Sequence, residues 1–181
     1  MFFGRCNERS RVLYNIAEPT SSSKRLLANH GDHRIGRTSL LQALADKDIQ
    51  VQHTGRELDN TTFEYVDLRF TENPSYPAVM GSVTSALFKK DSLDIDGLSQ
   101  FVQICTKQNE YLNSGVRIVL LIDEFDACTG DVQVVKSLLL AFYFLTQNYD
   151  IVVIIGSRDS VLETATKFKG SPAYPETIQL L

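Results

Sequence analysis

Two short, uninterrupted apolar runs constrain the fold of this chain more than any other feature of its sequence. The runs are Ile118–Ile122 and Ile151–Ile155, and each consists only of isoleucine, leucine and valine. Apolar runs of this length without alternation are typical of strands that are buried on both faces of a parallel sheet. Because parallel strands need crossover connections, which are usually helices, the runs predict an α/β fold.

Helical spacing in the segments around these runs agrees with that prediction. We expect helices over residues 9–17, 38–45, 76–89, 98–112, 132–148 and 160–168, and further strands over residues 25–30, 63–68 and 177–181. The helix over 132–148 is apolar nearly all round, so it is either buried or part of an interface. The alternation of strands and helices predicts a three-layer α/β sandwich around a mostly parallel, five-stranded sheet.

Length and composition are those of one globular domain. The 181 residues are 43% hydrophobic and 22% charged, which argues against disorder. No apolar run approaches the ~20 residues of a membrane-spanning helix, and the N-terminus meets charge already at Arg5. The three cysteines are widely spaced, which argues against disulfide scaffolds and zinc ribbons. We therefore expect a soluble, cytoplasmic protein with one domain over 1–181, comprising an N-terminal helix and loop over 1–24 and a core over 25–181.

Charge is distributed unevenly along the chain. The net charge is −4, yet residues 1–37 contain seven Lys/Arg and three Asp/Glu, whereas the rest contains eleven Lys/Arg and nineteen Asp/Glu. A basic end on an acidic body favours a localised anionic ligand and does not indicate a nucleic-acid track. A solvated basic face would explain the same charges.

A glycine-containing segment, residues 31–38, follows a predicted strand and opens a predicted helix. Its sequence GDHRIGRT has the spacing GxxxxGK[ST] of a phosphate-binding loop, in which backbone N–H groups cradle phosphate oxygens. Thr38 would supply a hydroxyl to Mg²⁺. Arg37 stands where the pattern has lysine, and its planar fork is not equivalent to an ammonium, so hydrolysis is affected more than nucleotide binding. The alternative is a strand–helix turn that binds nothing.

Polar residues follow both apolar runs. Asp123 and Glu124 follow the first run, and Ser157 and Arg158 follow the second. The carboxyl ends of parallel strands line the crevice where such sheets bind ligands. Asp123 would hold Mg²⁺ and Glu124 would polarise the attacking water, while Ser157 would bond that water and Arg158 would neutralise phosphate charge. Asp126 is interpreted as a surface or helix-capping acid. Solvated side chains at strand ends are the alternative.

Together these segments resemble the P-loop NTPases with an extra catalytic glutamate, most closely the STAND and archaeal-type AAA-like ATPases. Residues 34–41, RIGRTSLL, resemble the RxGKTSLL loop of that group except at Arg37. Residues 123–126, DEFD, resemble its Walker B motif, and residues 157–158 resemble its sensor. Members of the group usually continue into a helical lid, and this sequence ends where the lid would begin. We therefore expect a P-loop core with a degenerate Walker A and, within this sequence, no lid domain.

The resemblance also implies ligands and roles. The expected ligands are ATP and Mg²⁺, with adenine favoured over guanine. The resemblance implies nucleotide contacts from Gly31, Arg34, Ile35, Gly36, Arg37, Thr38 and Ser39, metal contacts from Thr38 and Asp123, and catalytic roles for Glu124, Ser157 and Arg158.

Two functions from different classes remain open. The first is a nucleotide-dependent switch with weak Mg²⁺-dependent ATP hydrolysis, which Asp123 and Glu124 favour. The second is a catalytically silent nucleotide-binding or scaffold module, which Arg37 and the missing lid favour. Either function is compatible with a protein partner or self-association. The sequence indicates neither a membrane nor a nucleic acid as a partner.

Overall fold

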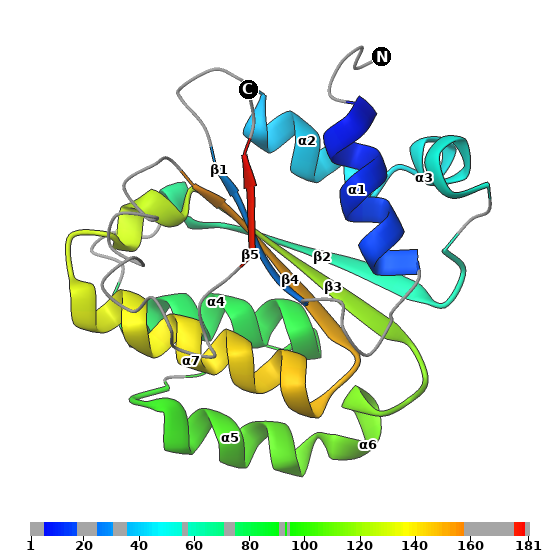
Figure 1. The fold of residues 1–181 in the computed structure, drawn as a ribbon. Coiled ribbons are helices and arrows are strands. Elements are labelled where there is room, and N and C mark those ends of the chain that lie inside the picture. The colour runs from blue at the N-terminus through cyan, green and yellow to red at the C-terminus, as the bar shows by residue number, and fades with distance from the viewer. Residues whose placement is uncertain are drawn as a thin grey trace.

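The sheet is parallel throughout. The computed structural model describes residues 6–17, 25–30, 36–55, 58–70, 75–90, 93, 95–157 and 176–179. Its strands are β1 (Leu26–His30), β2 (Thr61–Asp67), β3 (Arg117–Asp123), β4 (Ile151–Ser157) and the short edge strand β5 (Glu176–Gln179). They lie in the order β2-β3-β4-β1-β5, and every neighbouring pair is parallel (Figure 1). The predicted α/β class with a parallel sheet is confirmed.

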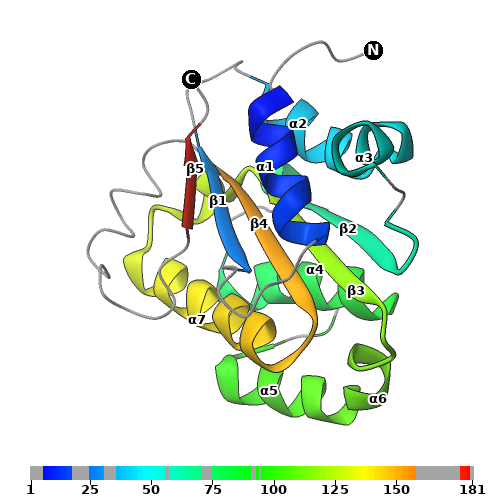
Figure 2. The same cartoon turned by 45° about the vertical axis from the view of Figure 1, so that its right-hand side comes forward.

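Helices cover both faces of this sheet (Figures 1 and 2). One face carries α1 (Cys6–Ala17), α2 (Arg37–Leu44) and α3 (Lys47–Thr54). The other face carries α4 (Tyr76–Phe88), α5 (Leu98–Lys107), α6 (Asn109–Leu112) and α7 (Val132–Asn148). Two short 3-10 helices follow these strands: η1 (Leu68–Phe70) comes directly after β2, and η2 (Phe125–Cys128) comes after β3 and the single residue Glu124.

Two hydrophobic cores explain why the central strands are apolar without interruption. Successive side chains of a strand point to opposite faces of the sheet. Val119 and Leu121 of β3 therefore pack with α1 and α2, whereas Leu120 and Ile122 pack with α4, α5 and α7. All seven residues of β4 are buried. No helix in the described ranges is long and apolar enough to cross a membrane.

The helix boundaries follow local signals where those signals exist. Helix α7 has the predicted bounds, because the side chain of Asp131 caps it by accepting hydrogen bonds from the backbone N–H groups of Gln133 and Val134. The predicted helix over 98–112 is divided into α5 and α6 around Gln108. The predicted helix over 160–168 lies outside the described residues.

Helix α3 was not predicted from the sequence. Its N-cap is Asp46, whose carboxylate accepts hydrogen bonds from the backbone N–H groups of Asp48 and Ile49, and its C-cap is Gly55 with a φ of 75°. Gln50 is its one buried residue. Without an apolar stripe, only the two caps signal this helix in the sequence.

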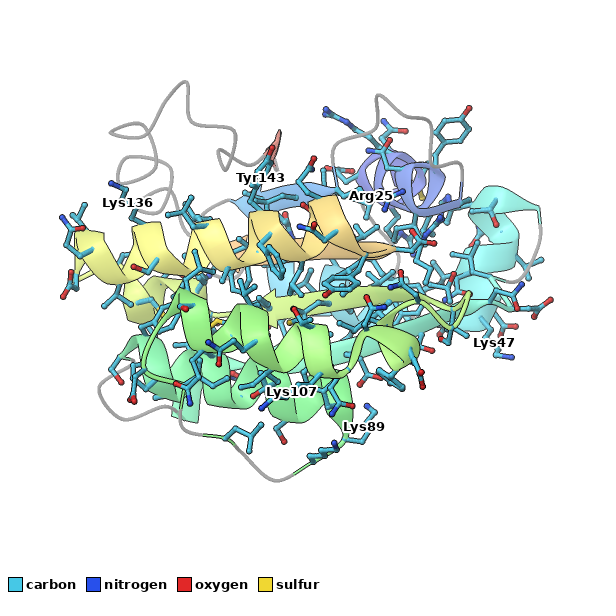
Figure 3. The ribbon with its side chains drawn as sticks, turned by 90° about the horizontal axis from the view of Figure 1, so that it is seen from below. Arg25, Lys47, Lys89, Lys107, Lys136 and Tyr143 are labelled. Carbon is cyan, nitrogen blue, oxygen red and sulfur yellow. The ribbon has the colours of Figure 1, made fainter. Side chains whose placement is uncertain are left out.

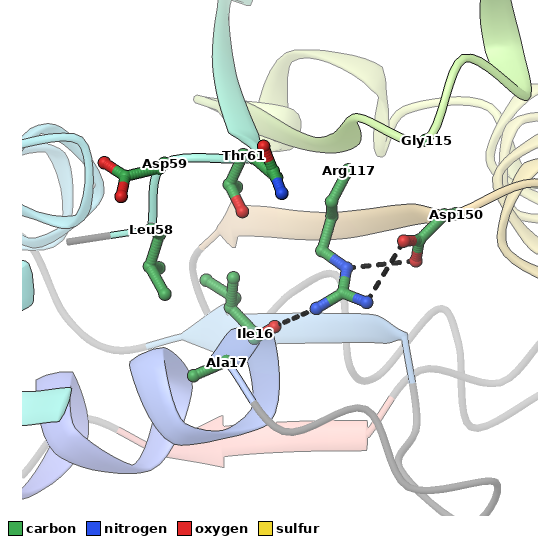
Figure 4. A pocket seen from close by; sticks show the side chains of 9 residues that line it. Ile16, Ala17, Leu58, Asp59, Thr61, Gly115, Arg117 and Asp150 are labelled. Atoms are coloured by element: carbon green, nitrogen blue, oxygen red, sulfur yellow. Dashed lines mark hydrogen bonds and ion pairs between the residues drawn. The ribbon is translucent and has the colours of Figure 1, made fainter. Parts of the chain in front are cut away.

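An ion cluster at the amino edge of the sheet fixes α1 in place. The Arg117 guanidinium donates hydrogen bonds to the carbonyl of Ile16, at the end of α1, and to both carboxylate oxygens of Asp150, at 3.0 and 3.1 Å (Figure 4). Arg25 also pairs with Asp150, at 3.3 Å. The cluster borders a pocket of about 350 Å³. Because Arg117 begins β3 and Asp123 ends it, this pocket lies at the opposite end of the strand from the predicted site.

Candidate functional site

Polar residues gather where the strands end. In the register of the sheet, Asp67 at the end of β2 pairs with Asp123 at the end of β3, and His30 at the end of β1 pairs with Ser157 at the end of β4. Helix α2 begins at the same edge, after Gly36. Open α/β sheets bind their ligands at this edge.

The start of α2 has the backbone features of a phosphate-binding turn. Gly36 is its N-cap and has a φ of 88°, a left-handed conformation that glycine adopts without strain. Thr38 is half-buried and Ser39 is exposed, both within the first turn. The N–H groups of a first helical turn have no partner within the helix and favour anions. Of the remaining predicted site residues, Gly31, Arg34, Ile35 and Arg158 lie outside the described residues.

Arg37 is a buried cation. By contrast, Lys89, Lys107 and Lys136 are exposed to solvent (Figure 3). The Arg37 side chain is 7% exposed, and its Nη1 donates a hydrogen bond of 3.3 Å to Oδ2 of Asp126. The Asp126 side chain is 11% exposed and belongs to η2, which follows β3 after Glu124. The interpretation of Asp126 as a surface or helix-capping acid is therefore wrong, because its largely buried carboxylate pairs with Arg37.

Asp123 is held by two hydrogen bonds. Its side chain is 1% exposed; Oδ2 accepts a hydrogen bond of 2.6 Å from the Tyr65 hydroxyl, and Oδ1 accepts one of 2.9 Å from the backbone N–H of Glu124. Burial raises the pKa of Tyr65 above its ordinary value, and the hydrogen bond to Asp123 raises it further, so the phenol stays protonated and donates. Sequence reasoning missed Tyr65, whose only signal is its place near the end of the neighbouring strand.

A second acid lies beside Asp123 in the register. Asp67 accepts hydrogen bonds from the guanidinium of Arg69, at 3.0 Å from Nε and 2.5 Å from Nη2. These hydrogen bonds lower the pKa of Asp67. The pair keeps the Asp67 carboxylate ionised at the sheet edge next to Asp123.

Glycine at position 156 allows α2 and Asp123 to approach β4 closely. A Cβ atom at Gly156 would lie 2.9 Å from Cδ1 of Leu41 in α2 and 3.0 Å from Oδ1 of Asp123. Real Cβ contacts are rarely this short. The next residue, Ser157, is fully buried at the end of the strand. Helix α2, β3 and β4 therefore meet at this point of the sheet edge.

Glu124 has an unusual backbone conformation. Its φ is 55° and its ψ is 40°, the left-handed region that costs a residue with a Cβ about 1–2 kcal/mol. The side chain is half-buried. Strain of this kind collects at functional sites, where the surrounding structure holds it in place.

The oxygen atoms at this edge suit a magnesium ion that binds mainly through phosphates. Asp123 offers a buried carboxylate and Thr38 a hydroxyl, both hard oxygen donors. Within the part of the chain that the structure describes, no group of three or more His, Cys, Asp and Glu side chains could hold a metal ion alone. Mg²⁺ in nucleotide sites characteristically takes one or two protein ligands and completes its shell with phosphates and water.

Comparison with known proteins identifies the fold. No family model and no curated protein matches the chain. Its structure is similar to the ORC1 protein of Aeropyrum pernix, solved in complex with DNA (TM-score 0.66, 15% identity, 97% of this chain and 44% of that one). It is also similar to the Walker-type ATPase PABY2304 of Pyrococcus abyssi (TM-score 0.59, 16% identity, 98% and 53%). A third similar structure is Cdc6p of Pyrobaculum aerophilum (TM-score 0.59, 12% identity, 97% and 45%).

The chain thus spans about half the length of the proteins whose structures it resembles. At these sequence identities the likeness concerns the fold, which is the α/β fold of the P-loop NTPases. This agrees with the fold that the phosphate-loop and acidic segments predict.

Proposed function

We propose that this chain is a P-loop domain that binds ATP together with Mg²⁺ at the carboxyl edge of its sheet. The observation that carries the proposal is the meeting of α2 and β3 at Gly156. A Cβ atom added at Gly156 would lie within 3.0 Å of both Cδ1 of Leu41 and Oδ1 of Asp123. The helix that begins at the phosphate loop and the acid that would hold the metal are therefore adjacent, as a Mg²⁺–triphosphate complex requires.

In this proposal the residues divide into three groups. The phosphates are surrounded by the residues of the loop and the first turn of α2, namely Gly31, Arg34, Ile35, Gly36, Arg37, Thr38 and Ser39. Thr38 and Asp123 hold Mg²⁺, which neutralises phosphate charge when bound. Glu124 orients a water molecule and accepts its proton, and Ser157 and Arg158 contact the water and the terminal phosphate.

The proposed protein is a nucleotide-dependent switch with weak hydrolysis. We propose that it is related to the STAND and AAA-like groups and has a degenerate Walker A with Arg37. We also propose that residues 1–181 form one nucleotide-binding domain. The nucleotide is an adenine nucleotide, the output passes to a protein partner or a second copy of the chain, and the location is the cytoplasm.

A second candidate function is a catalytically silent nucleotide-binding module. The ion pair between Arg37 and Asp126 favours it, because a guanidinium held by a carboxylate follows a moving phosphoryl group poorly. The two candidates share the binding site and differ in turnover alone.

Calorimetric titration of the chain with ATP and Mg²⁺ tests the proposal. We expect binding that weakens at least about tenfold in Thr38→Val, which removes the hydroxyl and keeps the shape. The matched control is Thr106→Val, because Thr106 is exposed on α5 on the other face of the sheet. No heat and no competition at millimolar ATP, or equal effects of both substitutions, would overturn the proposal. Phosphate release at saturating ATP then separates the switch from the silent module.

A further inference from the structure

The ion pair between Arg37 and Asp126 joins the cation of the phosphate loop to the acidic segment that follows β3. The two residues are 89 positions apart in the sequence, and the contact is 3.3 Å long. Both side chains are largely shielded from solvent, at 7% and 11% exposure. Solvent therefore screens this pair less than an exposed surface pair, and removing one partner leaves the other charge poorly solvated.

Asp126 is the fixed partner of this pair. It lies in the short 3-10 helix η2, whose first and last residues, Phe125 and Cys128, are 0% and 2% exposed. The backbone carbonyl of Asp126 accepts hydrogen bonds from the N–H and the hydroxyl of Thr129. Arg37 has a long side chain with several rotatable bonds, so any rearrangement at the pair moves the guanidinium.

The pair also changes the charge that a ligand meets. In a phosphate loop, the cation at this position attracts the β- and γ-phosphates. Here a carboxylate neutralises that cation before a ligand arrives. A triphosphate must therefore share the guanidinium with Asp126 or displace it.

We propose that Asp126 tethers Arg37 and thereby sets the affinity of the site for nucleotide β- and γ-phosphates. Asp126 is a positioning residue in this role, since it acts on the ligand through Arg37. The inference rests on the proposed function. It adds that nucleotide binding is limited by an acid that competes with phosphate for the same cation.

The test is the affinity of the whole chain for ATP, ADP and AMP with Mg²⁺, compared with Asp126→Asn. The variant keeps the shape of the side chain and removes its charge. We expect ATP to bind about tenfold more tightly, which corresponds to about 1.4 kcal/mol. AMP, which has no β- or γ-phosphate, should change less than about twofold. Asp126→Glu keeps the charge and should show no gain.

Asp131→Asn is the matched control, because it makes the same change five residues away, at an exposed side chain that caps α7 and whose capping role asparagine can keep. We expect it to tighten ATP binding less than about threefold, through general electrostatics alone. An equal gain in both variants, an equal gain for AMP, or weaker binding in Asp126→Asn would each overturn the tether. If Asp126→Asn does not fold, Asp126→Ser serves in the same comparison.

A second measurement keeps the tether separate from the proposed function. If neither the parent nor any variant binds ATP, the proposed function fails. The tether is then judged by thermal unfolding of Arg37→Gln, Asp126→Asn and the double variant. A coupled pair makes the two single losses non-additive, whereas additive losses would show that no tether exists.

Discussion

Replacing Asn29 by leucine should stabilise this protein. Asn29 lies on β1, is 1% exposed, and neither its Nδ2 nor its Oδ1 has a hydrogen-bond partner among the described residues. It shares the face of Leu27, which packs in the core under α1 and α2. A buried amide without partners loses its hydration and gains nothing in return.

The expected magnitude follows from the two unpaired groups. Each buried donor or acceptor without a partner costs about 1–3 kcal/mol. Leucine removes both groups but adds a little volume to a packed core, which offsets part of the gain. We therefore expect a net stabilisation of about 1–2 kcal/mol. For a chain of this length that raises the melting temperature by about 2–8 °C.

Urea unfolding and thermal melting of Asn29→Leu measure this gain. Asn29→Val is a smaller companion that should also gain stability if leucine is too large for the site. The matched control is Asn113→Leu, because Asn113 is exposed and its amide donates to Asn109, so no gain is expected there. Unchanged or lower stability in both Asn29 variants would refute the reasoning, and would show that the amide has a partner in solution.

Five further predictions concern the site and its surroundings. Gly156→Ala should lower the unfolding free energy by about 1–3 kcal/mol in urea, because the new methyl group would meet Leu41; an equally stable variant would contradict the close packing. Glu124→Gln should abolish hydrolysis and leave ATP binding nearly unchanged, as a phosphate-release assay would show. Glu124→Gly should raise the free energy of unfolding by about 1 kcal/mol, because glycine relieves the left-handed strain, as melting curves would show. Burial lowers the pKa of His53 from 6.5, so the unfolded chain binds the proton more readily than the folded chain. The free energy of unfolding should therefore fall as the pH drops below 6.5. Urea unfolding across this range should show a weaker pH dependence in His53→Gln. Arg37→Lys should raise turnover at saturating ATP about tenfold, because a compact ammonium follows the transferred phosphoryl group; an equal or slower rate would show that another step limits hydrolysis.

The sheet could be predicted from the sequence because each central strand is marked by a continuous apolar run of its own residues. The runs Ile118–Ile122 and Ile151–Ile155 are apolar at every position, only five residues long and rich in β-branched residues, which is typical of strands buried on both faces. Helix α3 was missed for the converse reason. Helix α3 buries only Gln50, whose amide donates a hydrogen bond to the carbonyl of Leu44. The position of α3 therefore depends on a polar contact, which produces no hydrophobic periodicity in the sequence.

The site could be predicted only in part, and the missing residues share a cause. Asp123 was expected because strand ends in parallel sheets face the ligand crevice. Tyr65 and Asp126 were not, since each contact is made by an element far away in the sequence. Tyr65 reaches Asp123 from the neighbouring strand, and Asp126 reaches Arg37 through the turn η2. Patterns along one chain do not specify such contacts.

The position of Asp123 itself follows from strand parity. Val119 and Leu121 point to the face covered by α1 and α2, so Asp123, two residues further on, points to the same face, on the side of α2. Continued strand geometry would send Glu124 to the opposite face, under α4 and α7. The left-handed backbone at Glu124 ends the strand there and begins η2 instead. The strain at this one residue therefore has a structural consequence, since it keeps the acidic segment at the edge of the sheet and brings Asp126 within reach of Arg37.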